Sequence, residues 1–271
     1  MEYKYFKGYK RSDYVRGNDV VNKKANLMIN DLLARENYLV VQANDLAKAF
    51  GGLTSFQHKI LDFAISFVKA DSTPFESYDV QILSILHHLG LNSSGQNYKR
   101  VAEAFKALNE NTALYFKIMR PNGKIGVRMT QLFSRIDMFE DGSIRFKFSE
   151  DAAPYIFDLR KNFYSFKLSE LATIKSKYSL IMMKLWEANK MGNEQNVTIS
   201  GSLEDWESWF LGKDTRWPAG KFGQKALDVA IKELTQKLGV WFTVTKQKRG
   251  RSIVGYEITI HGKDTKRSQL S

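Results

Sequence analysis

Residues 221–239, KFGQKALDVAIKELTQKLG, are the stretch of sequence that decides the fold. Their apolar positions fall at i, i+3, i+4, i+7 and i+11, which are Leu227, Ala230, Ile231, Leu234 and Leu238. This spacing places them on one stripe of a helix, with polar residues on the opposite face. Gly239 should end the helix, because glycine adopts the left-handed conformation without strain. The stretch therefore predicts an amphipathic helix over 221–238.

The residues that follow predict a β-hairpin. Residues 240–245, VWFTVT, alternate between two faces of a strand, and Tyr256, Ile258 and Ile260 share one face of a return strand. Between the two strands the sequence KQKRGR, residues 246–251, predicts a tight basic turn. A helix that leads into a hairpin with a cationic tip is the arrangement of a winged helix.

The charge around this segment favours an anionic partner. From Lys213 to Arg251 there are ten Lys or Arg residues and three acidic ones. The whole chain carries a net charge of +12, of which residues 151–271 hold +7. A basic helix face can be no more than a solvated surface. A basic helix and a basic hairpin tip in one segment instead favour a nucleic-acid site.

Composition limits the other possibilities. With 271 residues and 43% hydrophobic content, the chain is long enough for two folded domains. It has no cysteine, which excludes disulfides and thiolate metal sites and fits a reducing cytoplasm. No apolar run is long enough to span a bilayer, and the N-terminal residues lack the apolar core of a signal peptide. We therefore expect a soluble cytoplasmic protein without a membrane partner.

The order of predicted elements occurs twice along the chain. A capping pair, Thr54 and Gln57, precedes a first helix, and further helices are predicted over 79–89 and 96–109. Strands over 113–119, 124–139 and 144–149 follow them. The second half begins with a strand over 163–168 and a long helix over 169–190, before a strand at 196–200 and a short helix capped by Ser202 and Asp205.

The repeated order predicts an α+β fold of two tandem winged-helix domains. The expected divisions are a flexible leader (1–37), a first winged-helix domain (38–150), a connecting helix (151–162), a second winged-helix domain (163–262) and a polar tail (263–271). No linker rich in Gly, Ser or Pro separates the halves, so we expect them to pack together or to be joined by a helix.

Several segments resemble the iteron-binding plasmid replication initiators. FGQKALDVAIKEL matches that family's pattern at Phe222, Leu227, Ala230, Ile231, Glu233 and Leu234. KRGRSIVGYEITI resembles the family's terminal hairpin, and KLSELATIKSKYSLIMMKLWE resembles the helix that opens its second domain. The likeness covers about residues 38–261. The sequence departs from the pattern at Met183, where an aromatic residue is common, and at Thr235, where Asn is frequent.

The resemblance implies a function and a set of partners. It implies a bacterial, plasmid-associated initiator that binds direct repeats (iterons) at an origin as a monomer. It also implies a homodimer in equilibrium with the monomer, formed through the first domain, which represses the protein's own promoter at an operator. The host replication initiator and the replicative helicase are the implied protein partners.

The predicted DNA-binding residues lie mainly on the helix from 221 and on the hairpin tip. They are Lys221, Gln224, Lys225, Asp228, Lys232, Lys246, Lys248, Arg249 and Arg251, with Lys99 and Arg100 in the first domain. Gln224 and Lys225 are the candidates for reading base edges, since Gln pairs with adenine and Lys with guanine. The tip residues would hold phosphates, and Lys99 and Arg100 would make weaker auxiliary contacts.

No catalytic constellation is evident. The four histidines, His58, His87, His88 and His261, do not form the His-hydrophobic-His pair of a rolling-circle nuclease, and no phosphate-binding GxxxxGK[ST] loop occurs. We therefore expect no enzymatic activity, no cofactor and no metal. Two alternatives remain open: a two-domain winged-helix transcriptional regulator without a role in initiation, and a nicking replication enzyme.

Overall fold

The computed structural model describes residues 50–69, 71–154, 156, 168–190, 196–212 and 215–262. The predicted leader 1–37, the polar tail 263–271 and most of the strand at 163–168 lie outside these ranges, as does most of the connecting helix 151–162. Among the described residues, no helix is both long and apolar enough to cross a membrane.

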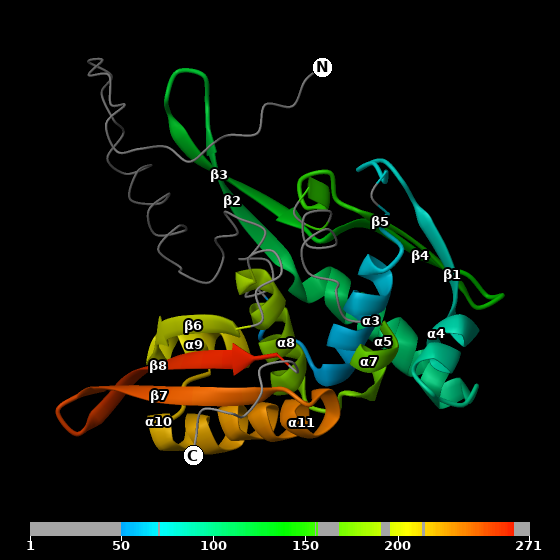
Figure 1. The fold of residues 1–271 in the computed structure, drawn as a ribbon. Helices are drawn as coiled ribbons and strands as arrows, with labels where there is room; N and C mark the ends of the chain where they lie inside the picture. The colour runs from blue at the N-terminus through cyan, green and yellow to red at the C-terminus, as the bar shows by residue number, and fades with distance from the viewer. Residues whose placement is uncertain are drawn as a thin grey trace.

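The first half of the chain folds around one apolar core. Its elements are α3 (Ser55–Ile65), β1 (Tyr78–Gln81), α4 (Ile82–His88), α5 (Gly95–Asn111), β2 (Ala113–Met119), β3 (Ile125–Gln131), β4 (Phe133–Met138) and β5 (Ser143–Phe148). Strands β1, β5 and β4 form an antiparallel sheet in that order, while β2 and β3 form a separate hairpin that projects from the body (Figure 1). Phe105 of α5 and Phe133 and Phe146 of the sheet are fully buried between helices and sheet.

The second half repeats this plan. Its elements are α7 (Leu168–Thr173), α8 (Lys177–Asn189), β6 (Asn196–Ser202), α9 (Leu203–Leu211), α10 (Ala219–Phe222), the π-helical turn η1 (Gly223–Leu227), α11 (Asp228–Leu238), β7 (Trp241–Arg249) and β8 (Ser252–His261). The sheet order β6-β8-β7 matches β1-β5-β4 position for position. The tandem winged-helix prediction is therefore confirmed in topology. The β2–β3 hairpin is an insertion that the second half lacks between its helix α11 and strand β7.

Both predicted capping boxes are present, at Thr54 with Gln57 and at Ser202 with Asp205. Two predicted elements of the first half were wrong in extent. The helix over 79–89 begins only at Ile82, because residues 78–81 pair with β5 as strand β1. The strand over 124–139 is two strands on either side of buried Leu132, since β3 pairs with β2 and β4 with β5.

The long helix predicted over 169–190 is broken between α7 and α8. Glu233 of α11 stabilises this break, because its carboxylate accepts the backbone N–H groups of Lys175 at 2.7 Å and Ser176 at 2.9 Å. These two amides at the start of α8 therefore have hydrogen-bond partners outside their own helix. The side chain of Ser176 then caps α8.

The two winged helices pack directly against each other through α3 and α8 (Figure 1). Lys184 of α8 forms an ion pair with buried Asp62 of α3 at 2.7 Å, and its ammonium lies 3.0 Å from Nδ1 of buried His58. Gly51 lies so close to α9 that a Cβ atom there would be 2.3 Å from the carbonyl oxygen of Trp209. The two domains therefore pack together as expected, through a close interface that contains an ion pair.

Candidate nucleic-acid interface

The predicted recognition helix is one continuous helical segment with a π turn inside it. Its buried residues are Phe222, Ala226, Leu227, Ala230, Leu234 and Leu238. Phe222 and Leu227 are five residues apart, more than the 3.6 residues of an α-helical turn. The π turn at 223–227, with its i→i+5 spacing, brings both to the buried face. Gly239, with φ of 68°, ends the helix in the predicted left-handed conformation.

The opposite face of this helix presents polar side chains to solvent. All five predicted contact residues on it are exposed, namely Lys221, Gln224, Lys225, Asp228 and Lys232. Gln224 and Lys225 lie within the π turn. Lys221 lies over the ring of Trp217, 4.6 Å from its centroid. None of the three lysines forms an ion pair with another residue that the structure describes, so their charge is available to a ligand.

The start of the helix is held by the hairpin behind it. The hydroxyl of Tyr256 in β8 donates to the carbonyl of Ala219 at 2.9 Å, and Trp206 Nε1 donates to the carbonyl of Tyr256, also at 2.9 Å. A Cβ atom on Gly223 would lie 3.4 Å from the Tyr256 hydroxyl. The position of the exposed helix face is thus fixed by buried aromatic residues of the same domain.

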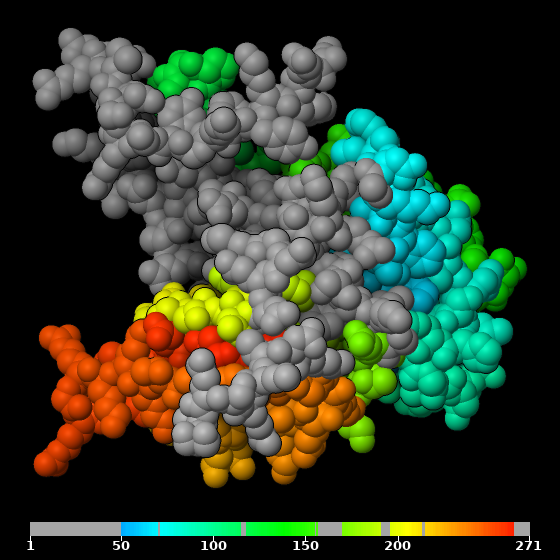
Figure 2. All heavy atoms as spheres, viewed as in Figure 1, coloured from blue at the N-terminus to red at the C-terminus, as the bar shows by residue number. Residues whose placement is uncertain are grey.

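The β7–β8 hairpin is the wing, and it extends away from the body (Figures 1 and 2). Its four predicted contact residues, Lys246, Lys248, Arg249 and Arg251, are exposed, and none has an ion-pair partner among the residues that the structure describes. The predicted turn over 246–251 was too long. Strand β7 continues to Arg249, and the reversal is made by Gly250, whose φ is 63°, and Arg251.

A β-bulge at Gln247 and Lys248 changes the direction of the wing tip. The sequence did not predict the contacts that hold this bulge in place. Gln247 Nε2 donates to Ser200 Oγ at 2.9 Å. Opposite it, a Cβ on Gly255 would lie 2.4 Å from Gln247 Oε1 and 2.5 Å from the carbonyl of Gly201. Gly255 therefore permits the close approach of three strands beneath the tip.

Glu233 is a second residue whose role the sequence did not predict. Burial raises its pKa, but hydrogen bonds from the amides of Lys175 and Ser176, with the ammonium of Lys237, lower the pKa overall. The carboxylate therefore stays charged and ties α11 to the turn between α7 and α8. In the sequence, the one indication of this role was the position of Glu233 in the Ala-Ile-x-Glu-Leu motif.

The corresponding surface of the first domain differs in charge. Lys99 of α5 forms an ion pair with Glu103 at 3.7 Å, and the guanidinium of Arg100 lies over the ring of Phe56 at 3.9 Å. The turn between β4 and β5, equivalent to the wing tip, contains Glu140 and Asp141.

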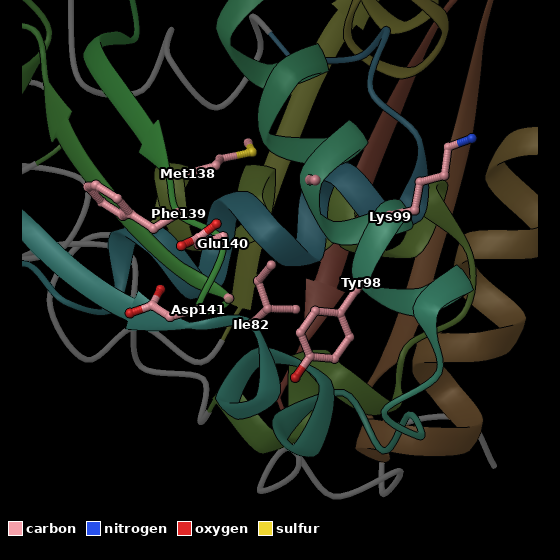
Figure 3. A pocket seen from close by; sticks show the side chains of 9 residues that line it. Ile82, Tyr98, Lys99, Met138, Phe139, Glu140 and Asp141 are labelled. Atoms are coloured by element: carbon pink, nitrogen blue, oxygen red, sulfur yellow. The ribbon is translucent and has the colours of Figure 1, made fainter.

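A hollow of about 350 Å³ separates this turn from α5 (Figure 3). Tyr98, Ile82 and Met138 contribute apolar surface to it, and Lys99 and Glu140 are also among its lining residues. The prediction that Lys99 and Arg100 contact DNA is untested by this geometry. Their surroundings are less cationic than those of the second wing.

Models of known families match both halves of the chain. The initiator replication protein WH1 domain matches residues 39–187, more than half of the chain, and the initiator Rep protein WH2 domain matches residues 202–260. The chain belongs to the initiator Rep protein family. Its function is replication initiation, and its two domains are the WH1 and WH2 winged helices of that family. No curated protein sequence matches the initiator.

Solved structures are similar to this chain. The initiator is similar to the Pi initiator protein crystallised with iteron DNA, at 15% identity and a TM-score of 0.61, over 81% of this chain and 95% of that one. A structure of domains 2 and 3 of RctB matches at 12% identity and a TM-score of 0.47, over 82% of each chain. The similarity to Pi agrees with the two-domain fold described above.

Among the residues that the structure describes, no group of three or more His, Cys, Asp or Glu side chains could hold a metal ion. His58 is buried in the domain interface, and His261 stacks on Trp241 with the ring centroids 3.4 Å apart. His58 and His261 therefore pack against neighbouring residues as part of the fold.

Proposed function

We propose that the initiator acts at a plasmid origin by binding direct repeats in double-stranded DNA with its second domain. The observation that carries the proposal is the set of exposed cations without ion pairs on one helix face and on the wing beside it. Unpaired cations can neutralise phosphates and release counterions, which is the main source of affinity for DNA. The crystallised Pi initiator, which shares the fold, is in complex with iteron DNA, and this supports the proposal.

Within this proposal the helix reads sequence and the wing holds the backbone. Gln224 and Lys225 contact base edges in a major groove, with Asp228 and Lys232 on the same exposed face. Lys246, Lys248, Arg249 and Arg251 hold phosphates or reach the adjacent minor groove. Lys99 and Arg100 make weaker contacts from the first domain.

The remaining assignments rest on the family resemblance. We propose that the boundary between the domains falls within residues 151–162, that the first domain forms a homodimer in equilibrium with monomer, and that the dimer represses the initiator's own promoter. The host replication initiator and the replicative helicase are the proposed partners, in the bacterial cytoplasm. We propose no catalytic role for the initiator, and an assay for metal-dependent nicking of plasmid DNA tests this, because a strand break would contradict it.

Replacement of Gln224 by alanine tests the recognition helix. The side chain points away from the buried stripe, so the melting temperature should hardly change. A base-edge contact accounts for roughly 1–3 kcal/mol of discrimination, so affinity for the cognate repeat should fall while affinity for unrelated DNA is kept. Cognate affinity within about twofold of the wild type would show that the helix is only a solvated structural element.

The length of the site gives a second test. Two winged helices on one face of a duplex occupy major grooves one turn apart, about 10–10.5 bp. A monomer should therefore protect roughly 20 bp of an asymmetric direct repeat. Footprinting of a monomeric preparation measures this. Protection of only ~10 bp, or a strict requirement for a palindrome, would exclude the first domain from the DNA-binding unit.

A further inference from the structure

The turn between α7 and α8 receives side chains from both winged helices. Lys59 of α3 donates from Nζ to the carbonyl of Ala172 at 2.6 Å, and Lys237 of α11 donates from Nζ to the carbonyl of Thr173. Ser55 of α3 also donates, to the carbonyl of Lys175 at 2.7 Å. Because the two lysines use consecutive carbonyls, one ammonium group from the first domain and one from the recognition helix lie close together.

Positive charge at this turn exceeds the negative charge that faces it. The carboxylate of Glu233 lies 3.5 Å from Lys237 Nζ, but the same carboxylate also accepts two backbone amides. Burial lowers the pKa of Lys59, and so does repulsion from Lys237 and from Arg100, while Glu233 acts in the opposite direction. Lys59 and Lys237 thus share the carboxylate of Glu233, and Arg100 adds a further positive charge near Lys59.

These ammonium groups keep hydrogen-bonding capacity. A lysine ammonium has three donors, and each of these lysines gives one to a backbone carbonyl. Lys237 has about a third of its side-chain surface exposed, Lys59 is half-buried, and Arg100 is exposed above the ring of Phe56. The cluster is therefore accessible from solvent at its rim.

The cluster lies between the two helices that the proposed function places on DNA. Helix α7 contacts α3 of the first domain, and α11 contacts α8 of the second. The recognition segment 219–238 is roughly 30 Å long at 1.5 Å per residue, and Lys237 is near its C-terminal end. A duplex that receives the N-terminal half of this segment and continues toward the first domain passes the cluster.

We propose that Lys59, Lys237 and Arg100 form a phosphate-binding site at the domain junction. It takes one backbone phosphate of the duplex where the DNA passes from one winged helix to the other. The inference rests on the proposed DNA binding by the second domain. It adds a contact that neither winged helix provides alone, because Lys59 and Arg100 belong to the first domain and Lys237 to the second.

The competing explanation is that the two lysines only cap the C-terminal end of α7. Cations near a helix C-terminus stabilise it through the helix dipole. The substitutions Lys59→Gln and Lys237→Gln separate the explanations, since glutamine can still donate to a carbonyl but carries no charge. If capping is the only role, DNA binding is unchanged in both variants.

The experiment measures affinity by fluorescence anisotropy for the cognate repeat and for an unrelated duplex, between ~50 and ~200 mM salt. Each glutamine variant should reduce the slope of log K against log salt by up to one phosphate equivalent, about 0.9. Affinity at the lower salt concentration should fall by up to about 15-fold for both duplexes. Lys106→Gln is the matched control, because Lys106 is exposed on α5 and paired with Glu110 at 3.8 Å. It should keep the wild-type slope.

Phosphate ethylation interference locates the contact. One phosphate between the two protected grooves should interfere with binding of the wild type and no longer with binding of Lys59→Gln. A wild-type slope in both glutamine variants would overturn the junction site and leave the recognition helix untouched. If Gln224→Ala has no effect while Lys59→Gln lowers the slope, the junction site stands and the base-reading assignment fails. A flat salt response of the wild type would overturn both.

Discussion

The two winged helices of this initiator share a topology but differ in surface charge. Sheet β6-β8-β7 repeats the order of β1-β5-β4, and α11 and α5 occupy equivalent places before the β7–β8 and β4–β5 hairpins. At the second wing tip the residues are Lys248, Arg249 and Arg251, whereas the equivalent turn in the first domain contains Glu140 and Asp141. The fold supplies a helix and a wing in both domains, and the side chains on them decide which domain can hold phosphates.

The difference extends to the helices. Lys225 and Lys232 have no ion-pair partner among the described residues, while Lys99 and Lys106 of α5 each form an i,i+4 pair with a glutamate. A paired lysine gains less from a phosphate, because it must give up an existing partner. We therefore expect the second domain to contribute more than the first to DNA binding.

The largest effect should come from breaking the interface that holds the two domains together. Asp62→Ala removes the carboxylate that lies 2.7 Å from Lys184 Nζ and leaves the ammonium of Lys184 in the interface without it. Loss of one partner of a buried ion pair costs about 3–5 kcal/mol, which urea denaturation would measure.

A compensating variant sharpens this test. Asp62→Leu combined with Lys184→Met removes both charges, and apolar replacement of a buried pair is often neutral or stabilising. The double variant should recover most of the stability. If Asp62→Ala alone costs less than ~1 kcal/mol, the interface does not hold the two winged helices as one unit.

The next effect concerns the wing tip. Replacing Lys248, Arg249 and Arg251 together with alanine should remove up to three phosphate contacts and lower the salt slope by up to about 2.7. Affinity for cognate and unrelated DNA should fall about equally, on the order of a hundredfold at physiological salt. Glu140→Ala in the first domain is the matched control and should not weaken binding. Selective loss of cognate binding would mean that the wing reads bases.

A smaller effect should follow pH through His58. Burial, and the nearby charges of Lys184 and Lys177, hold the pKa of His58 well below its usual value of 6.5. Below that value the unfolded chain takes up a proton that the folded chain does not. The free energy of unfolding should therefore fall as the pH is lowered from 6.5, by at most about 1.4 kcal/mol per pH unit from this group.

Comparison with a His58→Gln variant isolates this contribution. His261 has a pKa lowered by burial and acts in the same direction, so some pH dependence should remain. The slope of unfolding free energy between pH 5 and 6.5 should nevertheless be smaller in the variant. Equal slopes in the two proteins would show that His58 is protonated in the folded state.

The sequence predicted features with local signals better than features that depend on distant contacts, for a physical reason. The stripe from Leu227 to Leu238, the glycine stop at Gly239 and the capping box at Ser202 are local signals, and each was confirmed. The break between α7 and α8 is stabilised by Glu233, which is 57 residues from Ser176 in sequence. A contact between residues so far apart has no local signal.

The candidate site shows the same division. Exposure of the predicted cations followed from the helical period, which a single sequence reveals. The π turn that contains Gln224 and Lys225 was not predicted. The pairing of Lys99 with Glu103 was visible at i,i+4 spacing. The approach of Lys59 to Lys237 could not be predicted from the sequence, because it depends on how the domains pack.

The smallest effect should separate Lys99 of α5 from Lys232 of α11. Both side chains are exposed on a helix that precedes a wing, but Lys99 pairs with Glu103. An exposed i,i+4 pair is itself worth only about 0.3–0.5 kcal/mol, so Lys99→Ala should leave stability nearly unchanged. It should also leave DNA affinity within about twofold, because the carboxylate of Glu103 already offsets its charge.

Lys232→Ala, by contrast, should lower the salt slope by up to about 0.9. Glu103→Ala would then free Lys99 and should raise the slope slightly above that of the wild type. Salt titrations of the three variants on one duplex measure these differences. If Lys99→Ala costs as much as Lys232→Ala, the first domain contributes to phosphate binding as strongly as the second, and charge on the wing tip is not what distinguishes the two winged helices.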